Sequence, residues 1–332
     1  MKKSILASSI AAAVFGLGAV TGAQADTAVA NAANGVGDIL LVPYFTAQNN
    51  NATLLSITNT DTLNGKAVKV RFRGAANSDD IYDFQVFLSP TDVWTANVSK
   101  GADGRSVLTT TDASCTKPSA ATLNSTPFVT ARLNPALTAE QKASNTREGY
   151  IEIIGMADIP KDYLTGSGVG TAAPLAANAL PVLVSNGSNG GDGLTNTLYT
   201  AIKHVKSVAP CAGTAFTALD TVTWPMATLA ANAKGMTPST GGLIANWTII
   251  NTTNAAAWSG AAHAMAVTGD KAVLYVPQTA AAVSKTNADL FTADPLLIVA
   301  RKRVQGGILA PDTFPTEPIV AAGNYDFPDL ST

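Results

Sequence analysis

The clearest pattern in this chain is a regular alternation of apolar and charged side chains over residues 66–74, KAVKVRFRG. In an extended chain, the apolar residues lie on one side and the basic residues on the other: Val68, Val70 and Phe72 against Lys69, Arg71 and Arg73. A period of two is the signature of a β-strand, because successive strand side chains point to opposite faces. The segment therefore predicts a strand with one dry and one wet face.

Two neighbouring segments show the same period. Residues 53–61, TLLSITNTD, predict a strand that ends in a polar turn, and residues 83–98, DFQVFLSPTDVWTANV, predict a hairpin with Pro90 in its turn. Strands so close together, with no helix between them, favour antiparallel pairing over parallel βαβ units. We therefore expect a mainly β protein built as an antiparallel, immunoglobulin-like β-sandwich.

The rest of the chain contains a few helices and further strands. Two short helices are expected, one over 137–147 and an amphipathic one whose apolar residues are Leu194, Leu198, Ala201, Ile202 and Val205. Residues 109–135 have no clear period and read as a loop. Further strands are predicted from Gly149 onward and at 245–253, 263–267, 271–277 and 295–303.

These elements divide the chain into four regions. We expect a signal peptide at 1–25, an N-terminal β-sandwich domain at 26–160, a Gly/Ala-rich loop plus the amphipathic helix at 161–210, and a C-terminal β-rich domain at 211–332. The same order of a strand, an Asn-Thr pair, a short loop and another strand occurs near Ile57 and again near Ile250. This similarity is what a degenerate internal repeat would produce. The organisation expected is two packed sandwiches.

The N-terminus has the three parts of a bacterial export signal. Lys2 and Lys3 precede an uncharged apolar stretch over 5–20, which is followed by Ala23-Gln24-Ala25. Cleavage is expected between Ala25 and Asp26. The apolar part is shorter than the ~20 residues that a membrane-spanning helix needs, so an uncleaved anchor is the weaker alternative. We expect a secreted chain at the cell surface or outside the cell, in preference to the periplasm, with no transmembrane span.

Cys115 and Cys211 are the only cysteines. An even number of cysteines in an exported protein predicts a disulfide, with free thiols as the weaker alternative. The bond would tie the two halves of the chain together.

The chain is unusually poor in charge. Only 13% of its residues are charged and 46% are hydrophobic, with a formal net charge of −2, whereas about a quarter of residues are charged in ordinary soluble domains. A weakly charged exterior favours packing against copies of the same chain, although an ordinary low-charge secreted domain would share this composition. Without a basic cluster, nucleic acid is not an expected partner.

No combination of residues predicts an enzyme. The only histidines, His204 and His263, lack the spacing of a catalytic zinc site, and both are expected to be structural or exposed. No serine lies in a Gly-x-Ser-x-Gly elbow. Asp79, Asp80 and Asp83 form an acidic cluster, and a paired-acid glycosidase stays an alternative because its two acids can be distant in sequence; surface acids after a strand are the far commoner interpretation.

Calcium is the one ion for which the sequence offers ligands. Asn186, Asn189 and Asp192 supply oxygen atoms on a glycine-rich loop. A single carboxylate makes a weak site, and an ordinary Gly-rich turn is the better interpretation. No other cofactor is expected.

Four segments together resemble a family of secreted Gram-negative bacterial surface proteins: residues 35–61 (GVGDILLVPYFTAQNNNATLLSITNTD), 66–74, 83–98 and 245–253 (ANWTIINTT). Surface-layer proteins, including those that sheathe tubular extensions called nanopods, are the closest functional association. The resemblance implies self-assembly at the cell surface, with copies of the chain, and the outer-membrane surface or its lipopolysaccharide, as partners.

Three functions follow from these expectations, in order of preference. The first is a structural protein that assembles into an S-layer-like sheet, tube or filament. The second is a secreted adhesin or ligand-binding module that uses its loops or exposed tryptophans. The third is a secreted hydrolase, for which no nucleophile and base can be paired.

Overall fold

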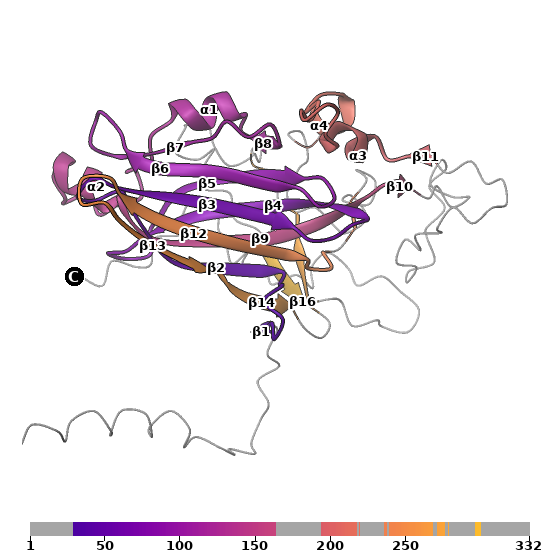
Figure 1. Cartoon of the computed structure of the whole chain (residues 1–332), viewed down its shortest axis with the longest axis horizontal. Helices are drawn as coiled ribbons and strands as arrows, with labels where there is room; N and C mark the ends of the chain where they lie inside the picture. The colour runs from indigo at the N-terminus through magenta and orange to yellow at the C-terminus, as the bar shows by residue number, and fades with distance from the viewer. Residues whose placement is uncertain are drawn as a thin grey trace, which may run out of the picture.

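The chain folds into an antiparallel β-sandwich of two large sheets, as a computed structural model shows (Figure 1). The structure describes residues 29–163, 194–217, 219, 236–237, 239–267, 271–275, 278 and 296–299. The predicted β-sandwich is confirmed, while its immunoglobulin-like character stays a prediction.

One sheet has seven strands and the other has five. The seven-stranded sheet has the order β1 (Val29–Asn31), β14 (His263–Val267), β2 (Ile39–Thr46), β9 (Glu148–Pro160), β4 (Asn64–Gly74), β5 (Asp80–Leu88) and β8 (Cys115–Lys117). The five-stranded sheet has the order β13 (Ala256–Ala261), β12 (Leu243–Asn251), β3 (Asn51–Asn59), β6 (Val93–Lys100) and β7 (Ser106–Thr109).

Smaller elements lie around the two sheets. Two pairs of short strands are formed by β10 (Asp162–Tyr163) with β11 (Leu194–Thr195) and by β15 (Lys271–Leu274) with β16 (Leu296–Val299). The helices are α1 (Ala120–Ser125), α2 (Ala139–Asn145), α3 (Thr197–Ile202) and α4 (Thr214–Thr217). The predicted amphipathic helix is thus present as the shorter α3, and Val205 lies beyond it, 59% exposed.

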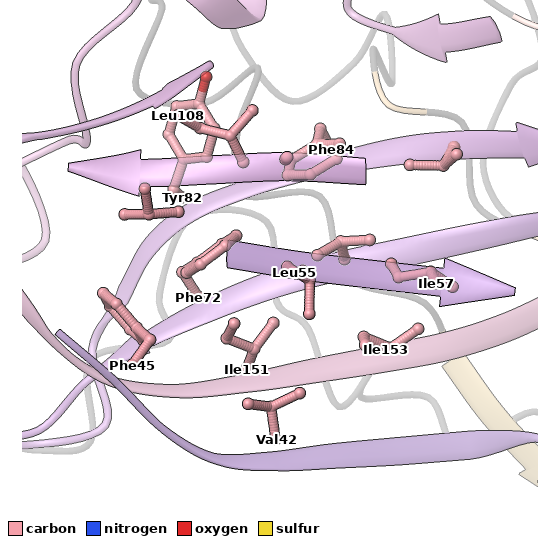
Figure 2. Packing of buried hydrophobic residues seen from close by; sticks show 14 of the residues in the cluster. Val42, Phe45, Leu55, Ile57, Phe72, Tyr82, Phe84, Leu108, Ile151 and Ile153 are labelled. Atoms are coloured by element: carbon pink, nitrogen blue, oxygen red, sulfur yellow. The ribbon is translucent and has the colours of Figure 1, made fainter. Parts of the chain in front are cut away.

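The main core fills the space between the sheets, and aromatic rings form one end of it (Figure 2). Phe72, on β4, packs edge-on against Phe45 and Phe128, with ring centroids 5.1 and 5.0 Å apart, and Tyr82 stacks on Phe128 at 4.5 Å. Such pairs add about 0.5–1.5 kcal/mol each to the stabilisation from apolar burial. The apolar face predicted for residues 66–74 is therefore confirmed as core.

The opposite face of β4 is not wet, contrary to the prediction. The Lys69 side chain is fully buried and bonds to Asp83 and Gln278, with its Nζ 2.5 and 2.8 Å from their oxygens. Tyr275 donates to Gln85 on the same face at 3.0 Å. A second apolar cluster covers the neighbouring part of this face; it includes Phe87, Met156, Ile159, Ile202, Phe216 and Tyr275. Residues distant in sequence, among them Ile202, Phe216, Tyr275 and Gln278, thus cover a face that the alternation alone marks as solvated.

The connection that was predicted as a hairpin, within residues 83–98, crosses between the sheets instead, and so does the connection before β4. β3 and β4 lie in different sheets, and so do β5 and β6, so the turn around Pro90 carries the chain from one sheet to the other. Each strand finds its partner elsewhere: β3 pairs with β6 and β12, and β4 with β5 and β9.

Strands β12, β13 and β14 join the same sandwich, whereas a second sandwich was expected. β12 pairs with β3 from Leu243–Asn59 to Asn251–Asn51, and β14 pairs with β2. The two segments of the suspected repeat, near Ile57 and Ile250, are therefore neighbours in one sheet. The predicted loop over 109–135 also contains β8 and α1.

Candidate functional site: an uncharged sheet face with an open edge

β13 forms one edge of the five-stranded sheet and is exposed along most of its length. Its sequence, AAWSGA, contains no charged residue and no proline. Its pairing with β12 runs from Asn251–Ala256 to Asn246–Ala261 without a bulge. Proteins usually protect such edges with charges, prolines, bulges or covering elements, because unpaired backbone groups are a template for another strand. β13 carries none of the sequence-level protections.

The ladder hydrogen bonds show which backbone groups of β13 point outward. Leu243 of β12 and Gly37 exchange backbone hydrogen bonds, and the backbone N–H of Ala262, the residue after β13, donates to the carbonyl of Ala245 at 2.8 Å. Both partners lie on the side of β12 that faces away from β3, so the odd-numbered residues of β12 direct their backbone groups toward β13. Antiparallel residues alternate between bonded and non-bonded pairs. The N–H and C=O groups of Ala257, Ser259 and Ala261 therefore point away from β12, toward the open edge.

Trp258 is the largest exposed side chain on this edge. Its side chain shares a face with Ile249, its cross-strand partner, and the residue is 54% exposed. Gly260 lies two residues further along the same face, opposite Trp247. A Cβ atom at Gly260 would lie 2.9 Å from the Trp247 ring, so the indole of Trp247 occupies the space that a side chain would fill.

The other described edges are shorter or covered. β7 has a bridge from Val107 to Pro127 and packs against α1. β8 is short, contains the disulfide cysteine Cys115 and runs into Pro118. β1 spans only Val29–Asn31. Among the strands that the structure describes, β13 is the longest that ends a large sheet.

The outer face of the five-stranded sheet continues the uncharged character of this edge. Its outward-pointing strand residues are hydroxyl, amide and aliphatic side chains: Ala52, Leu54, Ser56, Thr58, Val93, Thr95, Asn97, Ser99, Val107, Thr109, Ile244, Asn246, Thr248, Ile250, Ala257, Ser259 and Ala261. One row across the sheet reads Ser259, Thr248, Leu54, Asn97 and Thr109. Such a face offers hydrogen bonds and apolar contact without charge repulsion.

A shallow groove of about 420 Å³ lies on this face. Leu54 and Ala96 contribute apolar surface, and the polar lining consists of Ser56, Thr95, Asn97, Thr109, Thr110, Thr111, Asn246 and Thr248. Hydroxyl and amide groups of this kind can hydrogen-bond to a neutral polar partner.

A buried ion-pair network holds the segment that leads into β12. Lys66 lies near the start of β4, on the face that points into the core. Its Nζ is 2.6 Å from an Asp158 oxygen, 3.0 Å from an Asp61 oxygen and 3.2 Å from the Thr240 hydroxyl. Thr240 also donates its backbone N–H to Asp158 at 3.3 Å. Because Asp158 belongs to one sheet and Thr240 precedes a strand of the other, the network joins the two sheets and positions β12 and β13.

The two carboxyl groups of this network titrate differently. Burial alone would raise the pKa of Asp61, but hydrogen bonds from the backbone of Leu63 and from the backbone and side chain of Asn64, together with Lys66, hold it well below its ordinary value. Burial raises the pKa of Asp158 although Lys66 and Thr240 favour the charged form. Asp158 is the more deeply buried of the two, with 2% of its side chain exposed against 18% for Asp61.

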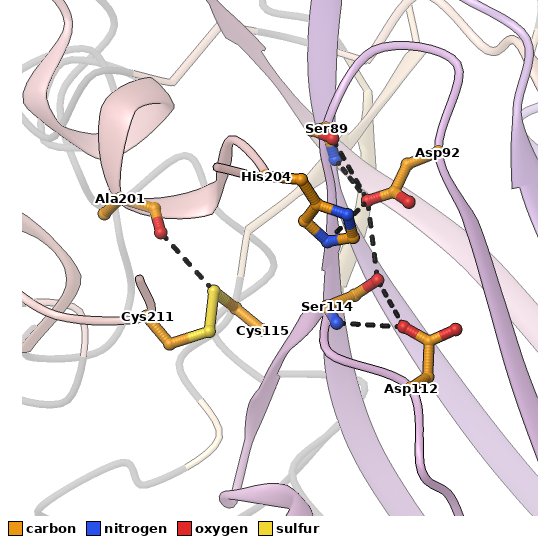
Figure 3. The surroundings of a disulfide bond; sticks show 8 residues. All are labelled: Ser89, Asp92, Asp112, Ser114, Cys115, Ala201, His204 and Cys211. Atoms are coloured by element: carbon orange, nitrogen blue, oxygen red, sulfur yellow. Dashed lines mark hydrogen bonds and ion pairs between the residues drawn. A yellow bond between two sulfur atoms is a disulfide. The ribbon is translucent and has the colours of Figure 1, made fainter. Parts of the chain in front are cut away.

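The predicted disulfide between Cys115 and Cys211 is confirmed (Figure 3). The two Cα atoms are 5.2 Å apart, across a sequence separation of 96 residues. Cys115 is fully buried on β8. The bond fastens the α3–α4 region to an edge strand of the seven-stranded sheet.

Beside the disulfide, two serines, two aspartates and a histidine lie close together (Figure 3). His204 Nε2 is 3.5 Å from Asp92 Oδ2, and the Ser89 hydroxyl donates to the same oxygen at 3.1 Å. The Ser114 hydroxyl donates to Asp112 at 2.6 Å. A hydrolytic triad needs a serine hydroxyl on the imidazole, whereas these hydroxyls bond to carboxylates. The contacts close the turn between β5 and β6.

The remaining predicted site residues fall in two groups. The cleavage-site pair Ala25 and Asp26 and the calcium candidates Asn186, Asn189 and Asp192 lie outside the described residues. The other predicted residues are placed: His263 bonds to Asn31 at 2.9 Å, and Asp80 and Asp83 are buried rather than at the surface. Within the described ranges there is no group of three or more His, Cys, Asp or Glu residues that could hold a metal ion. No helix described in the structure has the length and apolar character to cross a membrane.

The open edge is the feature that sequence reasoning missed. β13 was not predicted, because AAWSGA has neither a clean alternation nor β-branched residues. A signal was nonetheless present: the predicted strand over 245–253 ends in Asn251, Thr252 and Thr253 and is followed by Asn254, and polar residues of this kind after a strand are typical of a hairpin turn.

Comparison of the chain with protein-family models, curated proteins and solved structures found no match.

Proposed function

We propose that the mature chain is a structural protein of the outer surface of a Gram-negative bacterium, where its copies assemble into an S-layer-like sheet, tube or filament. The observation that carries this proposal is the open edge of β13, whose outward backbone groups are unprotected by charge or proline. An edge of this kind extends a sheet by accepting a strand from another molecule.

Two further features support the proposal. The outer face next to this edge has no charged strand residue, so copies can approach one another without strong repulsion. The sandwich itself is held by a disulfide and by buried ion pairs, a construction suited to an exported protein. The N-terminal segment is the signal that would deliver the chain beyond the inner membrane.

Electron microscopy of the purified mature chain, residues 26–332, tests this proposal. We expect ordered sheets, tubes or filaments as protein concentration rises, in buffers with and without calcium. Imaging of producing cells with the gene deleted and restored should show loss and return of a surface layer. A protein that stays monomeric in every buffer, in cells whose surface does not change on deletion, would exclude the proposal.

The groove on the five-stranded sheet favours a second candidate function, the binding of a neutral polar ligand such as a glycan. Its lining supplies hydroxyl and amide groups and lacks charged side chains. A glycan array would test this candidate with wild-type protein and a Thr95→Val variant. Binding that Thr95→Val abolishes would support a ligand-binding module, and an array without hits would exclude it for the glycans displayed.

A further inference from the structure

We propose that two copies of the chain join edge to edge through β13, antiparallel about a two-fold axis at Ser259, with Trp258 of each copy opposite Gly260 of the other. This inference deepens the proposed function and rests on it, because it names one contact, with its register, through which copies would assemble. A two-fold contact by itself closes a dimer, so a sheet, tube or filament also needs a second contact.

The direction of the backbone groups restricts the register. In an antiparallel pair, hydrogen-bonded residues must both point their N–H and C=O groups at the neighbouring strand. On β13 these residues are Ala257, Ser259 and Ala261. A two-fold axis at Ser259 pairs Ser259 with its own copy and Ala257 with Ala261 of the partner copy. In this register all three outward residues form hydrogen-bonded pairs with the partner copy. With the axis at Trp258 or Gly260, only two of them would do so.

The side chains favour the same register. Residues directly opposite each other in a sheet share a face, so an axis at Ser259 places the exposed indole of Trp258 beside a residue without a side chain. An aromatic residue can pack over a glycine of the neighbouring strand, and because the Trp247 indole already occupies the space at Gly260, Trp258 of the partner copy would pack against that indole. The molecule already contains one such pair, because Trp247 lies opposite Gly260 on the inner side of the edge. Gly260 would then lie between two indoles, one from each copy.

The absence of charge makes a second copy the fitting occupant. A two-fold contact brings each side chain close to its own symmetry mate, so any charged residue near the axis would face an identical charge. No residue of Ala256–Ala261 is charged. The edge is therefore compatible with itself, and an acidic or basic partner strand would find no complementary group along it.

Charge substitutions at the axis test this register. Ser259→Lys and Ser259→Glu each place like charges opposite one another, and we expect the association constant of each variant alone to fall by more than about tenfold. An equimolar mixture of the two variants should restore association, because the axis then pairs Lys with Glu. Sedimentation velocity measures all three samples. Ser259→Thr, which keeps an uncharged hydroxyl, is the matched control, and circular dichroism verifies that each variant is folded.

A disulfide trap gives an independent readout. Ser259→Cys should form a covalent dimer under mild oxidation, since cross-strand residues lie within the 4.4–6.8 Å Cα separation of disulfides. Thr109→Cys on β7, at the other edge of the same sheet, should not. Trp258→Ala should weaken association while leaving the fold intact.

The outcomes separate this inference from the proposed function. Wild-type protein that assembles, with no rescue on mixing and no Ser259→Cys dimer, would overturn the register and leave self-assembly standing. A dimer trapped through Thr109→Cys instead would move the contact to β7. Wild-type protein that never associates would overturn both.

Discussion

Replacing Lys66 by Met should destabilise the fold by about 3–5 kcal/mol at pH 7. Methionine keeps an apolar stem of similar length and removes the ammonium group. That group lies 2.6 Å from Asp158 and 3.0 Å from Asp61, and only 1% of the Lys66 side chain is exposed. The variant therefore leaves the Asp158 carboxyl group, with 2% of its side chain exposed, without its cation. Removing one partner of a buried ion pair typically costs this amount, because the remaining charge is uncompensated.

The deficit should shrink at acidic pH. Burial raises the pKa of Asp158, and Lys66 opposes this rise, so the Lys66→Met variant should have a still higher pKa at this group. A carboxyl group whose pKa is raised in the folded state contributes stability below its unfolded pKa, and this contribution is lost as pH rises through the folded pKa. We therefore expect a smaller difference from wild type at pH 4 than at pH 7.

Urea unfolding followed by tryptophan fluorescence measures these changes, since Trp94 is fully buried between the sheets. Lys100→Met, at an exposed position at the end of β6, is the matched control and should change stability by no more than about 0.5 kcal/mol. The double variant Lys66→Met/Asp158→Asn should cost less than the sum of the two single variants. A cost below about 1 kcal/mol for Lys66→Met, or strict additivity in the double variant, would refute the role assigned to this network.

Three further predictions concern the core, the disulfide and acid stability. Phe72→Ala should cost about 3–5 kcal/mol in urea unfolding, because it opens a cavity among Phe45, Tyr82 and Phe128; a cost under about 1 kcal/mol would contradict the packing. Replacing Cys115 and Cys211 by Ser should remove up to about 4–5 kcal/mol, the chain-entropy value for so long a loop, and an unchanged urea midpoint would show that the bond does not stabilise the fold. The pKa of Asp61 lies below its ordinary value because its hydrogen bonds and Lys66 outweigh the effect of burial. The ionised Asp61 therefore stabilises the folded state above the unfolded pKa of about 4, and this stabilisation is lost as pH falls. Asp61→Asn should therefore cost about 1–3 kcal/mol at pH 7 and progressively less below pH 4, and a cost that is constant with pH would contradict this assignment.

The open edge gives a physical reason for the proposal of self-assembly that does not depend on composition alone. Low charge describes the whole chain, but β13 concentrates the features that allow pairing at one place: outward backbone groups, an exposed indole and a glycine on the same face. Charge substitutions at Ser259 would thus separate an effect of this edge from a general effect of the weakly charged surface.

Local patterns in the sequence determined much of the sandwich. Period-two alternation identified β3, β4, β5, β6 and β9, and placed Val70 and Phe72 in the core, because the direction of a strand side chain depends only on its position along the backbone. The pair Cys115 and Cys211 could also be predicted, since a chain with two cysteines has only one possible intramolecular disulfide.

Only the tertiary structure decided which strands are neighbours and which faces are covered. The alternation at Lys69 and Arg71 is the same whether solvent or protein lies above it, and segments distant in sequence, including Tyr275 and Gln278, make that face buried. Likewise, Pro90 marks a turn but not whether the next strand stays in the same sheet. The open edge at β13 is the extreme case, because an edge is defined by the absence of a neighbouring strand, and long-range packing alone determines where the sheet stops.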